Sequence, residues 1–131
     1  MSVSDLETLI AAAERGASTN YALYGFLLPS AIVMRGGRTR VVGFVCSPGG
    51  EETDMLAVAD AAREAARGAD AVVLVISGRA DDGAAFAAVV AERAGGVRRN
   101  RVARVAGGPV VWRGADGPTI AGVCGLISGP A

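Results

Sequence analysis

A pattern of strand, small-residue loop, acidic pair and alanine-rich helix occurs twice in succession, and it constrains the fold more than any other feature of the sequence. The first copy spans residues 41–68 and the second spans residues 71–96. Two strands joined by a helix normally lie parallel in one sheet, with a right-handed crossover between them. The repeat therefore predicts a parallel β-α-β-α-β unit at the centre of the fold.

Each helix of the repeat is predicted from apolar residues at helical spacing. The apolar face of the first helix comprises Met55, Val58, Ala59, Ala62 and Ala66. In the second helix Phe86, Val89 and Val90 share a face, and Arg93 takes the next position on it. An arginine near a helix end can lay its stem on apolar surface while its guanidinium reaches water. Residues 71–76 are continuously apolar, which is typical of a central strand covered on both faces.

The segments on either side of the repeat predict a helix and antiparallel hairpins. Apolar spacing predicts an N-terminal helix over residues 4–15, with Gly16 as its stop. The predicted strands outside the repeat cover residues 22–28, 31–34, 102–106, 110–113 and 119–127, and the turn Arg35-Gly36-Gly37-Arg38 leads into the strand 39–46. We therefore predict a single α/β domain over residues 1–131, a mixed sheet whose central parallel unit is flanked by antiparallel hairpins.

Composition excludes many common enzyme designs. All 13 basic residues are arginine, and the chain has neither lysine nor histidine. It therefore lacks the usual base of a nucleophilic triad, the commonest metal ligand and the amine of a Schiff base. Hydrophobic residues make up 51% of the chain, which favours self-association into a homo-oligomer. We expect no cofactor.

A ligand site is predicted where the parallel strands end. Loops after residues 46, 76 and 106 should leave the same edge of the sheet, and ligands of open α/β sheets bind at that edge. Two of these loops lead into predicted helix N-termini, which attract anions. The residues best placed to bind a small anionic ligand are Ser47, Gly49, Gly50, Ser77, Gly78 and Arg79.

Acidic residues at the same helix starts support two further interpretations. As dipole partners and N-caps they would stabilise the helices and repel an anion. As ligands they would form an oxygen-rich pocket for Mg²⁺ or Ca²⁺, although their spacing matches no known loop. They are Glu51, Glu52, Asp54, Asp81 and Asp82.

Other candidate features favour structural roles. Cys46 and Cys124 lie in apolar runs without metal-site spacing, as reduced thiols of a cytoplasmic protein do, although Cys46 also ends a strand where a nucleophile could sit. Five arginines fall within residues 93–104, but no aromatic residue lies between them to stack on a base. The longest apolar runs are too short to span a bilayer. We expect neither nucleic-acid nor membrane binding.

Two hypotheses about function follow. The first is a non-catalytic binding or assembly module that self-associates, because the chain lacks histidine, lysine and any convergent catalytic set. The alternative is a binder of a small molecule, or an enzyme, that uses an anion or a divalent metal at the loop edge of the sheet. The sequence predicts the position of that site, with residues 47–52 lying beside residues 77–82.

Overall fold

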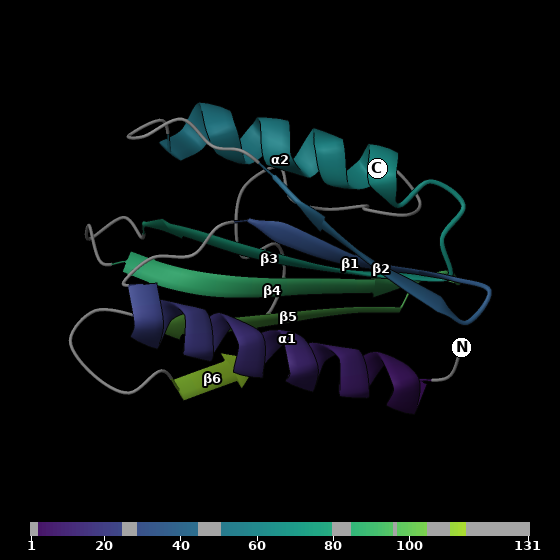
Figure 1. Ribbon diagram of the computed structural model, residues 1–131, viewed down its shortest axis with the longest axis horizontal. Helices are drawn as coiled ribbons and strands as arrows, with labels where there is room; N and C mark the ends of the chain where they lie inside the picture. The colour runs from purple at the N-terminus through teal and green to yellow at the C-terminus, as the bar shows by residue number, and fades with distance from the viewer. Residues whose placement is uncertain are drawn as a thin grey trace.

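The computed structural model shows a β-sheet with a helix on each face (Figure 1). It describes residues 3–24, 29–44, 51–79, 85–95, 97–104 and 111–114. In chain order the elements are α1 (Val3–Tyr24), β1 (Ser30–Arg35), β2 (Arg38–Gly43), α2 (Glu51–Ala65), β3 (Ala71–Arg79), β4 (Ala85–Arg93), β5 (Val97–Arg104) and β6 (Val111–Gly114). These strands form one sheet in the order β2-β1-β3-β4-β5-β6.

Neighbouring strands in the described part of the chain are all antiparallel, so the predicted mixed sheet with a central parallel unit is wrong. The error lies in the second copy of the repeat. Its predicted helix is the strand β4, which pairs with β3 from Ala71 opposite Arg93 to Arg79 opposite Ala85. β3 and β4 thus form an antiparallel hairpin where the sequence predicted a helical crossover.

β4 shows no alternation of apolar and polar residues because both of its faces are buried. Ala87, Val89 and Ala91 pack in the cluster beneath α1, whereas Ala88 and Val90 pack in the cluster beneath α2. A strand covered on both faces is an uninterrupted apolar run, and periodicity alone does not separate it from a buried helix. Alanine, the strongest helix former, favoured the wrong choice.

In the first copy of the repeat, the two strands that the helix joins are separated by a third strand, β1. β2 and β3 run in the same direction because each is antiparallel to β1, which lies between them. α2 therefore joins two strands of like direction, as predicted, but it passes over β1 to do so. The helix itself is confirmed, with Val58, Ala59, Ala62 and Ala66 buried.

The N-terminal helix is longer than predicted. α1 continues through Gly16 to Tyr24, so Gly16 is not its stop and residues 22–24 are helical where a strand was predicted. The apolar face carries on across the glycine, because Leu6, Ile10, Ala13 and Ala17 lie at helical spacing and are all buried. Packing of this face against the sheet outweighs the roughly 1 kcal/mol penalty of an interior glycine. Residues 25–28 lie outside the described residues.

Two hydrophobic clusters hold the helices on opposite faces of the sheet. On one face α1 packs on alternate residues of the central strands: Ala71, Val73, Val75, Ala87, Val89 and Ala91. On the other face α2 packs on the intervening residues: Val72, Leu74, Ile76, Ala88 and Val90. Small alanines on the strands and on α2 let the layers approach closely. Figure 1 shows the consequence, with α2 and α1 on opposite sides of the sheet.

The hairpin between β1 and β2 supports the C-terminal end of α2. Its turn at residues 36–37 has φ angles of 56° and 79°, which glycine adopts without strain, as the sequence predicted. From the last residue of β1, the Arg35 guanidinium donates hydrogen bonds to the carbonyl oxygens of Ala65 and Arg67, the latter at 2.8 Å. Gly68 ends the helical turn with a φ of 72°. A cation at this end of α2 also complements the helix dipole.

Candidate functional site

The strand ends that were predicted to frame a ligand site do lie at one end of the sheet, for a different reason. β2, β3 and β5 run in the same direction because β1 and β4 alternate with them in an antiparallel sheet. Gly43, Arg79 and Arg104 therefore end strands on the same side. Only β4 separates Arg79 from Arg104, which is level with Gly78, so these two ends are about 10 Å apart. Gly43 is level with Val75, four residues before the end of β3, and therefore lies farther from Arg79. Loops that leave these ends are not immediate neighbours.

The second predicted anion-binding loop is part of a strand. Ser77, Gly78 and Arg79 lie in β3, opposite Ala87, Phe86 and Ala85 of β4. Ser77 is half-buried. The helix N-terminus that was predicted to follow Asp81 and Asp82 does not exist, because β4 begins at Ala85. The dipole argument for anion binding therefore fails at this loop.

The remaining candidate residues fall at or beyond the limits of the structure. Ser47, Gly49, Gly50, Asp81, Asp82, Cys46 and Cys124 lie outside the described residues. α2 begins at Glu51, which places the backbone of Glu51, Glu52 and Asp54 in its first turn. A cation site formed by these carboxylates and those of the second loop is thus a prediction without a structural test. Among the residues that the structure describes, no three acidic or cysteine side chains gather as metal ligands would.

Two polar contacts that the sequence did not predict join α1 to strands β5 and β6. Arg101 of β5 donates from Nε to Glu14 at 2.6 Å, and the ion pair is partly buried, with 16% of the Glu14 side chain exposed. Trp112 of β6 donates from its indole N–H to the Ser18 hydroxyl at 3.0 Å. Glu14 and Ser18 are four residues apart on one face of α1. Arg101, one of the five arginines within residues 93–104, therefore has a partner inside the fold.

The largest exposed segment of the sheet that the structure describes is its edge strand β2. Five of its six residues are exposed, and Val42 is half-buried. Val41 has 69% of its surface in solvent, and Val111 on the opposite edge strand has 71%. We call residues 38–43 with their open backbone side the β2 edge.

The backbone of the β2 edge alternates between groups bonded to β1 and groups that face outward. Phe44 donates its N–H to the carbonyl of Pro29, and the register pairs Val42 with Ala31 and Arg40 with Val33. In an antiparallel ladder hydrogen-bonded pairs alternate with pairs whose groups point away. The N–H and C=O groups of Thr39, Val41 and Gly43 therefore point to the open side.

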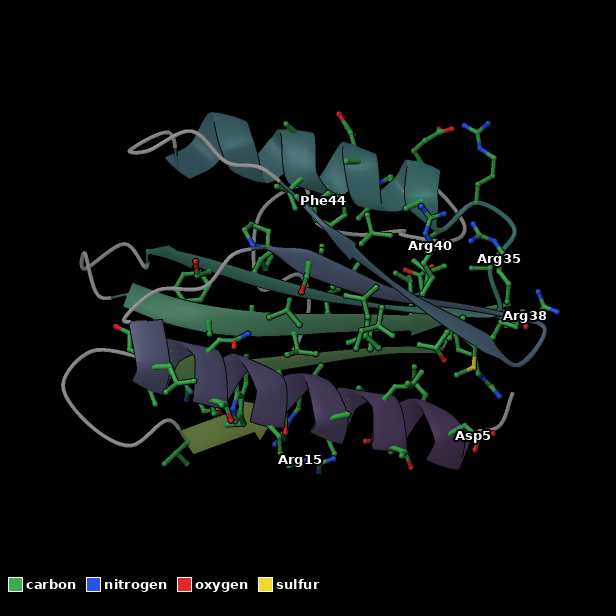
Figure 2. The ribbon with its side chains drawn as sticks, viewed as in Figure 1. Asp5, Arg15, Arg35, Arg38, Arg40 and Phe44 are labelled. Carbon is green, nitrogen blue, oxygen red and sulfur yellow. The ribbon has the colours of Figure 1, made fainter. Side chains whose placement is uncertain are left out.

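Side chains of the β2 edge divide between the two faces of the sheet. Even-numbered residues lie on the face of α2, where Phe44 packs against the cluster beneath that helix. Figure 2 shows Arg40 and Phe44 on this side. Thr39 and Val41 lie on the face of α1, because they stand opposite Met34 and Ile32, which pack in the cluster beneath α1.

No protein-family model matches this chain, and neither does any curated protein or solved structure. Within the described residues, neither helix has the length and apolar character needed to cross a membrane.

Proposed function

We propose that this protein is a non-catalytic binding or assembly module that associates with copies of itself. The observation that supports the proposal best is the β2 edge, an exposed strand whose outward backbone groups pair with no strand in the described part of the chain. Open strand edges are templates for pairing with another chain. A sheet whose two faces are covered by helices can be extended only at its edges, and the β2 edge is the longer of the two in the described residues.

The chemistry of the chain is consistent with a structural role. It has no histidine and no lysine. Several of its charged side chains have partners within the fold. Arg35 caps α2, and Glu14 pairs with Arg101. A cytoplasmic location belongs to the same proposal, supported by the two cysteines without metal-site spacing.

Sedimentation velocity over a concentration series, from low micromolar to millimolar chain, tests self-association. We expect the weight-average mass to rise from one chain toward two as concentration increases, because a single edge strand is a modest interface. A constant monomer mass across the whole series would overturn the proposal.

A ligand binder at the loop end of the sheet is the second candidate. Its support is the position of Gly43, Arg79 and Arg104, which end strands on the same side of the sheet. A thermal-shift screen against nucleotides, phosphosugars, Mg²⁺ and Ca²⁺ separates this candidate from the first. A ligand at 100 times its dissociation constant adds about 2.7 kcal/mol to the free energy of unfolding. Absence of any stabilised condition would count against this candidate and leave the assembly module in place.

A further inference from the structure

We propose that a second copy of this chain pairs with the β2 edge in antiparallel fashion, about a two-fold axis at Val41, so that one sheet continues through both copies. The proposal rests on the self-association proposed above and names its interface and register. A closed dimer built from one edge requires that the same residues meet on both sides of the axis. Antiparallel strand pairing meets this requirement.

The backbone permits only a few registers. Outward groups at Thr39, Val41 and Gly43 must face outward groups of the second copy, because the intervening residues are bonded to β1. With the axis at Val41, Val41 faces Val41, and Thr39 faces Gly43 of the second copy. Each of these pairs exchanges both of its N–H···O bonds. Every outward group of the β2 edge then has a partner.

Charge and backbone pairing together favour this register over its two neighbours. Moving the axis to Arg40 places that guanidinium directly opposite its own copy, which is destabilising. Moving the axis to Val42 leaves the outward groups of Thr39 without a partner from the β2 edge. With the axis at Val41, Arg40 instead faces Val42 of the second copy, and no like charges stand opposite each other.

The side chains on both faces fit the same register. On the face of α1, the 69% exposed Val41 would meet its own copy beside the half-buried Ile32, which extends the apolar cluster across the axis. On the face of α2, Arg38 would lie opposite Phe44 of the second copy. A guanidinium against an aromatic ring is a favourable pair. Arg40 thus disfavours the register with its axis at Arg40, and Arg38 supports the register with its axis at Val41.

The opposite edge of the described sheet is a weaker candidate. β6 has four residues, Val111–Gly114, against six in β2. The described residues of β6 therefore offer fewer outward backbone groups to a partner than those of β2. The β2 edge is therefore the one that we assign to the dimer.

Charged substitutions of either sign at Val41 test the position of the two-fold axis directly. Val41→Arg and Val41→Glu each place like charges opposite each other in the proposed register, so each variant alone should dimerise at least about tenfold more weakly than the wild type. An equimolar mixture should recover dimer, because arginine then faces glutamate. Val41→Ile is the matched control, since it keeps an apolar β-branched side chain and the backbone N–H, and it should dimerise like the wild type.

Val41→Pro supplies an independent test of the backbone pairing. The N–H that proline removes points outward, so the bonds to β1 remain and the chain should fold as a monomer. Circular dichroism checks that the variant is folded, and sedimentation velocity measures its mass. If Val41→Pro fails to fold, the exposed-site charge variants carry the test.

The outcomes separate the interface from the proposed function. A wild type that stays monomeric at every concentration overturns both. A wild-type dimer that persists unchanged in Val41→Arg and Val41→Glu overturns the β2 interface and leaves self-association standing. A dimer lost in both variants but not recovered in their mixture overturns the axis at Val41.

Discussion

Replacing Ala88 by leucine distinguishes the observed strand β4 from the helix that its sequence predicted. In the helix the apolar face is formed by Phe86, Val89 and Val90, and Ala88 lies on the opposite, solvent side. Leucine there would change stability by a few tenths of a kcal/mol, because it is a good helix former. In β4 the side chain of Ala88 is 0% exposed, in the cluster beneath α2.

A leucine at this position must force three further carbon atoms into a filled core. Overpacking of this kind costs about 1–3 kcal/mol. At roughly 4 °C per kcal/mol for a domain of this size, the melting temperature should fall by roughly 4–12 °C. Urea unfolding followed by circular dichroism measures the loss of free energy. Ala61→Leu, at an exposed position of α2, is the matched control and should be nearly neutral. Equal stability of the two variants would refute β4 as a buried strand.

Further predictions concern the contacts that fix the helices. Gly68→Ala should destabilise the fold by about 1 kcal/mol because the φ of Gly68 is 72°, whereas Gly16→Ala in the interior of α1 should stabilise it by about 0.5–1 kcal/mol. Urea unfolding measures both changes, and a change of the same sign for both would contradict the assigned backbone. Arg35→Ala should lose about 1 kcal/mol with the cap of α2, and an unchanged melting temperature would count against that cap. Glu14→Gln should lose about 1 kcal/mol, less in high salt, and a double-mutant cycle with Arg101→Met should show coupling.

Most elements with one face in water were predictable, although the C-terminal part of α1 was not. The apolar face of α2, the glycine turn at residues 36–37 and strand β1 all followed from spacing and turn chemistry. β4 was not predictable in this way, because its two buried faces erase the strand period. Its partner β3 is adjacent in the sequence, so the error came from the missing strand period and from the alanine content of β4, not from a distant partner.

The candidate site was predictable only in outline. The common side on which β2, β3 and β5 end was correct, because alternate strands of an antiparallel sheet share a direction. The helix start after Asp82 was wrong for the same reason that β4 was wrong. The partners Glu14 and Arg101 lie 87 residues apart, so no local spacing signals their contact. The exposed β2 edge required knowledge of strand order, since its sequence alone does not place it at the end of the sheet.

Residue-resolved amide hydrogen exchange in dilute and concentrated protein tests assembly through the β2 edge most directly. The amides of Thr39, Val41 and Gly43 point outward and should exchange rapidly in dilute protein. They should become protected as concentration rises, whereas Arg40 and Val42, bonded to β1, should be protected throughout. Equal exchange of the outward amides at both concentrations, in protein that sedimentation shows to be dimeric, would contradict the account.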